Sequence, residues 1–171
     1  MLSMRSVIGE HHVRQEATDD PVRLVDDLRG KVASYVDADA PVAFRGSIPD
    51  GPGFWFPPTV LAPMANEHRA AREEIFGPVA CVIPFDDEAD AVRIANDSIY
   101  GLSGSIWTTD GAKALRVARR IDTGVLSVNS NSSVRVTTPF GGFKQSGYGR
   151  ELGPDALDAY TEVKNIYYAT D

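Results

Sequence analysis

The sequence predicts an α/β protein with an open, mostly parallel βαβαβ sheet flanked by helices. Apolar runs typical of strands, at residues 79–85, 103–108 and 124–129, alternate with amphipathic runs typical of helices, at 86–96 and 110–121. Strands that alternate with helices form parallel sheets with right-handed crossovers. A chain of 171 residues, of which 43% are hydrophobic and 24% charged, is also long enough to bury a core.

Shorter elements precede this unit. Asp20 can cap a helix whose first residue is Pro21, because apolar residues recur after it at helical spacing. A short strand is predicted at residues 41–46. It is followed by a loop rich in Pro and Gly at 47–58 and by an apolar run at 59–62.

Local signals also place the ends of the helices in the βαβαβ unit. Asp86, Asp87 and Asp110 can cap helix N-termini, where their charge also suits the helix dipole. Gly124 is predicted to stop the second helix. A polar, Gly-rich loop comes next, and a short helix is expected near residues 151–160.

The chain ends on Thr161 to Tyr168, which alternates like a half-buried strand. A terminal strand needs an edge with which to pair, and left unpaired it is an aggregation hazard. We therefore expect a homo-oligomer in which this strand pairs with another chain.

Composition excludes several classes of partner. The net charge of -7 and the scattered Lys and Arg residues argue against a nucleic-acid partner, which needs a concentrated basic surface. No apolar run approaches the roughly 20 residues of a membrane span, and the opening residues lack the apolar core of a signal peptide. We expect a cytoplasmic protein without a membrane partner.

The sequence offers few residues for nucleophilic or metal chemistry. Cys81 is the single cysteine and lies inside an apolar run, which favours a core residue over a thiol nucleophile. His11 and His12 lie near the N-terminus, and His68 lies in a polar turn without a partner at metal-ligand spacing. We expect no metal site.

Two further motifs carry polar groups or glycines. Gly147, Gly149 and Gly153 are spaced one residue wider than the dinucleotide fingerprint, which favours glycines that serve tight turns. Glu73 and Glu74 directly precede a compact turn, which should hold one carboxylate rigidly at a strand entrance. A solvated acidic pair is the alternative for these two residues.

Several motifs occur in the order and approximate spacing typical of aldehyde dehydrogenases: GFWFPPTVL, AREEIFGPV, ANDSIYGLSGSIWTTD, GVLSVN, PFGGFKQSGYGRELG and AYTEVKN. The chain resembles the C-terminal part of that family's catalytic domain over residues 20–168, less closely before Phe54. The resemblance divides the chain into an unmatched leader at 1–19 and a partial catalytic domain at 20–171.

The resemblance also implies roles for individual residues. Glu74 would hydrogen-bond the nicotinamide ribose of NAD(P) and Phe76 would pack beside it. Phe140 would line the aldehyde tunnel, together with Asn129. Val134 stands where some members of the family place a second aromatic residue, which implies a wider or less aromatic pocket.

The family's nucleophilic cysteine, its glutamate base and its dinucleotide-binding domain have no counterpart in this sequence. Neither Cys81 nor Glu151 lies at an equivalent position. We therefore expect a truncated aldehyde dehydrogenase-like protein, an oxidoreductase by family, that is inactive alone and is completed by another chain. Two alternatives stay open: a repurposed cofactor-independent enzyme or small-molecule binder that uses the remnant tunnel, and an oligomerisation module.

Overall fold

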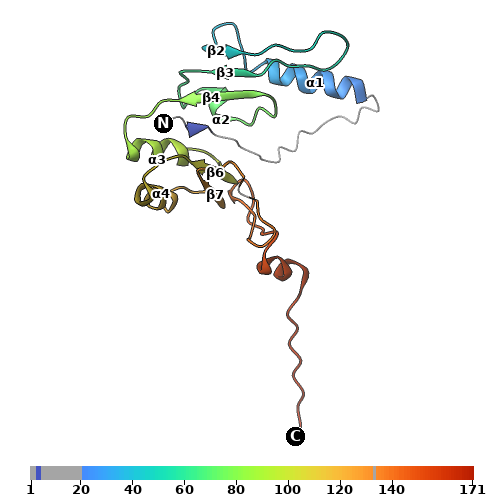
Figure 1. Cartoon of the computed structure of the whole chain (residues 1–171). Coiled ribbons are helices and arrows are strands. Elements are labelled where there is room, and N and C mark those ends of the chain that lie inside the picture. Colours follow the sequence, from blue (N-terminus) through green and yellow to red (C-terminus); the bar gives the residue numbers. More distant parts are fainter. Residues whose placement is uncertain (1–2, 5–20, 133) are drawn as a thin grey trace.

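The structure of the protein is a computed structural model that describes residues 3–4, 21–132 and 134–171 (Figure 1). The predicted capping residue Asp20 and nearly all of the predicted leader at 1–19 lie outside the described residues. Helix α1 (Pro21–Ala33) begins at the predicted proline.

Four strands form the largest sheet, in the spatial order β1, β4, β3, β2. They span Ser3–Met4 (β1), Val79–Ile83 (β4), Thr59–Leu61 (β3) and Val42–Arg45 (β2). β3 and β4 are parallel, and the connection between them contains helix α2 (Arg69–Arg72). β2 and β3 are joined by a loop without a helix and are antiparallel, as the lack of a crossover requires. The strand predicted at 41–46 is confirmed as β2, and the apolar run at 59–62 contains β3.

The other strands form two small pairs. β6 (Ser103–Ile106) and β7 (Val125–Val128) run parallel, joined by helix α4 (Gly111–Ala118). β5 (Tyr100–Gly101) and β8 (Phe143–Lys144) are antiparallel. Helix α3 (Glu88–Asn96) connects β4 to β5.

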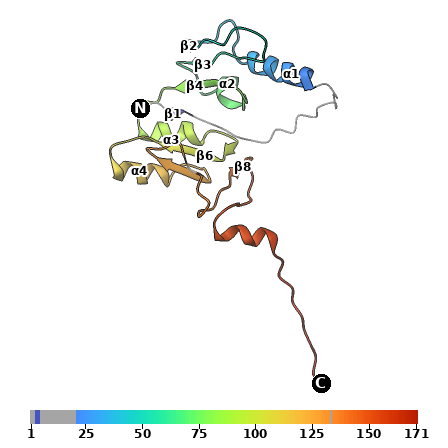
Figure 2. The same ribbon diagram turned by 45° about the vertical axis from the view of Figure 1, so that its right-hand side comes forward.

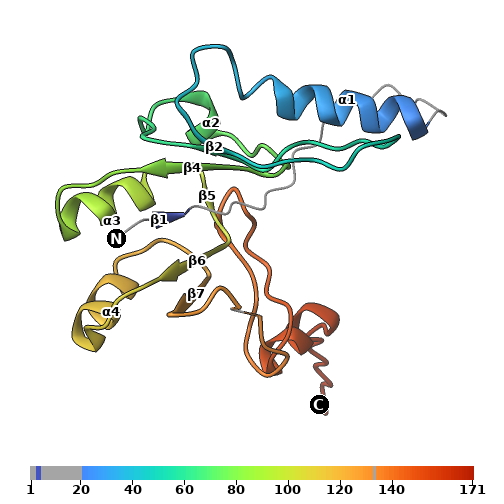
Figure 3. The same cartoon turned by 45° about the horizontal axis from the view of Figure 1, so that its top comes forward.

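The predicted α/β class is confirmed, as is the order of strands and helices along the βαβαβ unit. The observed strand pairing is more mixed than the predicted, mostly parallel sheet. β4 and β6 are not hydrogen-bonded neighbours, because the antiparallel strand β1 lies between them (Figure 3). The N-terminal residues show no strand periodicity in the sequence, so this insertion was not predicted.

Two predicted helix caps are confirmed by hydrogen bonds. Asp87 Oδ1 accepts a hydrogen bond from the Asp90 backbone N–H at 2.8 Å, and Asp110 Oδ1 accepts one from the Lys113 N–H at 2.9 Å. Each carboxylate thereby satisfies an amide that has no partner within the helix.

The predicted helix stop at Gly124 is wrong. Helix α4 ends at Ala118, and its last turn is closed by the Arg119 N–H, which donates to the Leu115 and Val117 carbonyls. Gly124 instead lies where a Cβ atom would be 1.8 Å from the carbonyl oxygen of Gly141. The glycine is therefore required by the close approach of a distant backbone segment.

The core lies between α1, α2, α3 and the four-stranded sheet. Leu61 on β3 is fully buried at its centre. Among the apolar residues at helical spacing, Val32 near the end of α1 and Tyr35 just after it are buried, whereas Leu28 is half exposed. The buried cluster consists of Val32, Tyr35, Leu61, Met64, Ala70, Ile75, Ile83 and Ile94.

The C-terminal part leaves the body of the molecule. The predicted short helix is a 3-10 helix at Pro154–Tyr160, and residues 161–171 then run outward as an extended, exposed tail (Figure 2). Thr161 to Tyr168 was predicted as a strand, but it forms none in the single chain, because a strand requires a hydrogen-bonded neighbour and none of the described strands pairs with it. Its pairing with another chain stays a proposal.

Helices α3 and α4 are joined by an ion pair. Arg116 donates to both oxygens of Glu88, at 2.8 Å from Nε and 2.6 Å from Nη2. These hydrogen bonds are the main reason why the pKa of Glu88 lies below its usual value of 4.5. The positive charges of Arg116 and Lys113 lower this pKa further.

We expect this ion pair to make the stability of the protein pH-dependent. A lowered folded-state pKa stabilises the protein above the unfolded pKa, and the effect is lost as pH falls through the folded value. Arg116→Gln should therefore lower the melting temperature slightly at about pH 6, and the difference should shrink toward about pH 3. Thermal unfolding across this range checks it. Arg135→Gln is the control: the Arg135 guanidinium donates to the Ser132 hydroxyl and the Val134 carbonyl, so this substitution should show no such trend.

Among the described residues, no helix is long and apolar enough to cross a membrane.

Candidate functional site

The turn between α2 and β4 buries one carboxylate and exposes one aromatic ring. Glu74 is only 5% exposed, whereas Phe76 is 72% exposed. Ile75 between them is buried in the core, and Phe76 adopts a positive φ of 58°. A non-glycine residue rarely adopts this conformation, and such strain persists only where its surroundings impose it. The turn is therefore a fixed structure that turns Glu74 inward and Phe76 outward.

Glu73 anchors the start of this turn. Its Oε2 accepts hydrogen bonds from the Tyr35 hydroxyl at 2.8 Å and from Arg69 Nε at 3.2 Å. The Arg69 guanidinium also lies 4.1 Å from the centre of the Tyr35 ring. Burial and the neighbouring Glu73 raise the pKa of Tyr35. The alternative of a solvated acidic pair is wrong, because Glu74 is buried and Glu73 is hydrogen-bonded to Tyr35 and to Arg69 on α2.

Tyr100 on β5 lies within electrostatic reach of the same acidic turn. Its pKa is raised first by burial and then by the negative charges of Glu74 and Glu73. Sequence reasoning did not select Tyr100, since nothing along the chain links it to Glu74. The negative charge of the buried Glu74 carboxylate therefore acts on the Tyr100 hydroxyl from the neighbouring turn.

Cys81 is a structural residue of β4. Its Sγ donates to the Ala70 carbonyl at 3.3 Å, and burial raises the pKa of the thiol, which disfavours the nucleophilic thiolate. His68 caps α2, where its Nδ1 accepts a hydrogen bond from the Ala70 N–H at 3.1 Å. His11 and His12 lie outside the described residues. Within the described ranges, no three His, Cys, Asp or Glu side chains gather where they could hold a metal ion.

The three predicted pocket residues lie after β7. Asn129 is bound to the backbone of Thr108, with its Oδ1 accepting and its Nδ2 donating at 2.9 Å each. Val134 is exposed, and Phe140 pairs with Glu151 through two backbone hydrogen bonds of 2.7 Å. Asn129 borders an open hollow that includes neither Val134 nor Phe140; its other lining residues are Trp107, Thr108, Thr109, Gly111, Ala114 and Val128.

The Gly-rich loop is held together by hydrogen bonds from the Arg150 side chain to the loop's own backbone. The guanidinium of Arg150 donates to the carbonyls of Gly142, Tyr148 and Gly149, at 3.0, 3.3 and 2.9 Å. Gly147 and Gly153 have positive φ angles of 100° and 64°. These contacts support the interpretation that the glycines serve tight turns.

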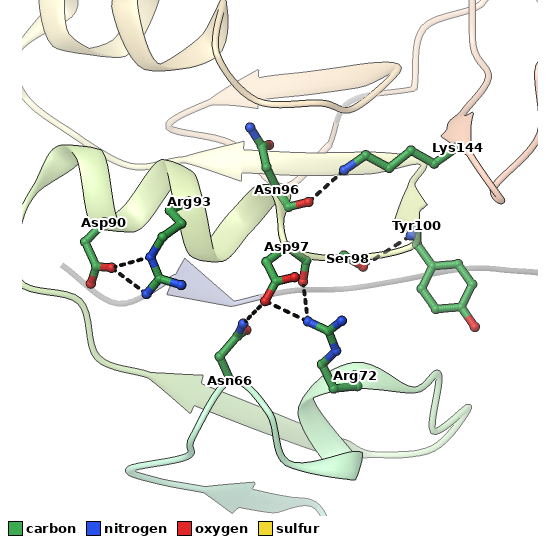
Figure 4. Close-up of polar contacts among 9 residues, drawn as sticks. All are labelled: Asn66, Arg72, Asp90, Arg93, Asn96, Asp97, Ser98, Tyr100 and Lys144. Atoms are coloured by element: carbon green, nitrogen blue, oxygen red, sulfur yellow. Dashed lines mark hydrogen bonds and ion pairs between the residues drawn. The ribbon is translucent and has the colours of Figure 1, made fainter.

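A cluster of polar contacts around Asn96 and Asp97, at the end of α3, was not predicted from the sequence; we call it the polar hub (Figure 4). Asp97 Oδ2 accepts a hydrogen bond from Asn66 at 2.6 Å and pairs with Arg72 at 2.8 Å, while the Asn96 carbonyl accepts a hydrogen bond from Lys144 at 2.8 Å. The only signal in the sequence is an Asn-Asp pair at the end of an amphipathic run, which is typical of any turn. This hub joins α2, α3 and β8, and so connects the acidic turn to the Gly-rich loop.

Comparison with known proteins agrees with the observed architecture. The profile of the aldehyde dehydrogenase family matches residues 23–166. Among curated proteins, geranial dehydrogenase of Castellaniella defragrans is 49% identical over 115 residues, which are 67% of this chain and 24% of that protein. Betaine aldehyde dehydrogenase of Bacillus subtilis is 40% identical over 150 residues, 83% of this chain and 31% of that protein.

Solved structures give the same result. Betaine aldehyde dehydrogenase of Staphylococcus aureus, in complex with NAD+, superposes with a TM-score of 0.73 at 40% identity and covers 78% of this chain and 28% of its own. Aldehyde dehydrogenase of Mycobacterium tuberculosis, also complexed with NAD+, has a TM-score of 0.73 at 39% identity and covers 86% of this chain and 32% of its own.

The fold defines a mixed α/β unit with one strained acidic and aromatic turn. By sequence and structure alike, the chain belongs to the aldehyde dehydrogenase family. It spans about a quarter to a third of the length of the curated relatives that it matches.

Proposed function

We propose that this chain supplies the C-terminal part of an NAD(P)+-dependent catalytic unit that oxidises aldehydes to carboxylic acids. The observation that carries the proposal is the turn at Glu74 and Phe76, in which a buried carboxylate stands beside an exposed aromatic ring on a strained backbone. Backbone strain of this kind is common at ligand sites.

The two residues fit one part of the cofactor. The carboxylate of Glu74 is an acceptor suited to ribose hydroxyls, and the exposed ring of Phe76 offers an apolar surface to the adjoining nicotinamide. When bound, the dinucleotide would accept the hydride that leaves the aldehyde carbon. The two family members named above whose structures were solved with NAD+ support the assignment.

The chain alone is proposed to be inactive in this reaction. Attack on an aldehyde requires an activated nucleophile and a base. Cys81 has a raised pKa and a hydrogen bond to Ala70, so it does not offer an activated thiolate. The attacking thiolate, the base and the remainder of the cofactor site would come from polypeptide outside this sequence. On this proposal Phe140, Val134 and Asn129 border the aldehyde pocket once it is complete.

The test combines the purified chain with the part of Bacillus subtilis betaine aldehyde dehydrogenase that this chain does not match. Thermal unfolding of the mixture is followed while NAD+ or NADP+ is added, since stabilisation by a ligand rises with the logarithm of its concentration over its dissociation constant. Glu74→Gln should require about tenfold more dinucleotide for the same shift, because hydrogen bonds to a charged group are the stronger ones. Glu67→Gln is the matched control, an exposed carboxylate on the same segment.

Two results would count against the proposal. One is a mixture whose melting temperature does not change when NAD+ or NADP+ is added. The other is a Glu74→Gln variant that responds as the wild type does. Robust NAD-dependent oxidation of an aldehyde by the chain alone would overturn the proposed inactivity.

A second proposal concerns assembly. In the extended tail, the side chain of Val163 is fully exposed, and Ile166 and Tyr168 are nearly so. Apolar side chains in such numbers are unfavourable in water and mark an interaction surface. We propose that Thr161 to Tyr168 pairs with another copy of the chain in a homo-oligomer.

Sedimentation of a tail variant tests this assembly. Val163→Lys places a charge within the proposed interface and should shift the protein toward the monomer. Thr170→Lys, an exposed position beyond the proposed strand, should leave the assembly unchanged. A wild-type protein that is monomeric at all accessible concentrations would refute the proposal.

A further inference from the structure

Helix α2 is a single turn, and the residues that carry Glu74 and Phe76 follow it directly. α2 has four residues, Arg69–Arg72, and the N–H of Glu73 closes its end by donating to the Arg69 carbonyl at 2.9 Å. An isolated helix of this length is not stable in water. The position of α2, and of Glu74 just after it, therefore depends on side-chain contacts with other parts of the fold.

The turn after α2 also needs outside contacts to keep its shape. The positive φ of Phe76, 58°, costs free energy in a residue other than glycine, and it persists only where the surrounding structure imposes it. On the C-terminal side of Glu74, the chain is fixed by Ile75, which is buried in the core. On the N-terminal side, it is fixed through the side chain of Glu73.

Two groups bind the Glu73 carboxylate, and they differ in exposure. Arg69 Nε lies 3.2 Å from Glu73 Oε2, but the two side chains are 51% and 49% exposed, so solvent screens this ion pair and makes it weak. The Tyr35 hydroxyl donates to the same oxygen at 2.8 Å, and Tyr35 is only 3% exposed. Hydrogen bonds to a charged group are stronger than those between neutral groups. Tyr35 therefore fixes Glu73 more firmly than Arg69 does.

We propose that Tyr35 is a positioning residue of the dinucleotide site: through Glu73, its hydroxyl sets the place of the Glu74 carboxylate. The inference rests on the proposed function and extends the site to a side chain that touches no ligand. Without the hydroxyl, α2 and the turn can shift, and Glu74 then spends less time where ribose hydroxyls would meet it. A binding-competent state that is only partly populated lowers the apparent affinity by the same fraction.

The first measurement uses the full chain without cofactor or partner. Tyr35→Phe removes the hydroxyl and keeps the ring, which belongs to the buried cluster. The amides of Arg72 and Glu73 donate to the His68 and Arg69 carbonyls, so their hydrogen exchange reports local opening at the end of α2. We expect both amides to exchange at least about tenfold faster in Tyr35→Phe, since a hydrogen bond to a charged group is worth about that factor or more.

The second measurement uses the mixture with the unmatched part of the Bacillus subtilis protein. Tyr35→Phe and Glu73→Ala should each require about tenfold more dinucleotide for the same rise in melting temperature. Together they should require no more than Glu73→Ala alone, because both act through one hydrogen bond. Glu73→Gln keeps an acceptor for the Tyr35 hydroxyl and should respond better than Glu73→Ala. Ile106→Val is the control, a buried residue of β6 outside the cluster around Leu61: it should lower the melting temperature without changing the dinucleotide requirement.

The inference is overturned if Tyr35→Phe leaves the exchange of both amides unchanged, or if its effect on the dinucleotide requirement adds in full to that of Glu73→Ala. A mixture in which Tyr35→Phe responds to the dinucleotide as the wild type does would also refute it, while upholding the proposed function. Faster exchange in Tyr35→Phe, together with a wild-type mixture that responds to neither NAD+ nor NADP+, would uphold the control of the turn by Tyr35 and refute the proposed function.

Discussion

Gly124→Ala is expected to destabilise the protein by about 3 kcal/mol, because an overpacked backbone contact must move to admit the new methyl group. The added Cβ would lie 1.8 Å from the Gly141 carbonyl oxygen and 2.8 Å from its carbon. Backbone cannot rotate away as a flexible side chain can. The Gly124 N–H also donates to the Gly101 carbonyl at 3.0 Å, so a shift would disturb β5 as well. Thermal or urea unfolding would show a melting temperature lower by roughly 10 °C.

Gly30→Ala is the matched control for this substitution. Gly30 lies inside α1, and a Cβ atom built on it meets nothing within 4 Å. Alanine has a higher helix propensity than glycine, so this variant should be more stable than the wild type by roughly 0.5–1 kcal/mol. Equal effects of the two substitutions would show that the contact between Gly124 and Gly141 does not constrain the fold.

Leu61→Ala is expected to cost about 3 kcal/mol, within the range for buried leucines that leave a cavity. Leu61 is 0% exposed and lies on β3, between two strands and beneath α1 and α2. The core around it is also what holds Ile75, and Ile75 holds the turn that carries Glu74 and Phe76. The substitution should therefore also weaken any dinucleotide response. Urea unfolding followed by tryptophan fluorescence measures the loss of stability.

Leu115→Ala removes the same atoms from a surface position. Leu115 lies on α4 and is 61% exposed, so its truncation should change the free energy of unfolding by no more than about 0.5 kcal/mol. A large effect at Leu115, or a small one at Leu61, would mean that the core is not where the structure places it.

The sequence predicted most of the helices and strands but few of the contacts at the candidate site. Asp87 and Asp110 each cap a helix by accepting a hydrogen bond from the backbone N–H three residues later, so these caps could be predicted from the local sequence, and both are observed. The turn before β4 was expected to hold a carboxylate rigidly, but the sequence left open whether Glu74 is buried or solvated. Its burial depends on how the neighbouring Ile75 packs against residues of the core that are distant in sequence. No pattern within a short window contains that information.

Periodicity, caps and motifs depend on neighbouring residues, so they were sufficient to predict the α/β class, the order of strands and helices and the family. Three features depend on the folded molecule: β1 separates β4 from β6, Gly124 faces Gly141, and Glu74 turns inward while Phe76 turns outward. These features arise where segments distant in sequence meet. Their geometry is set by packing and by the satisfaction of backbone hydrogen bonds across the whole molecule.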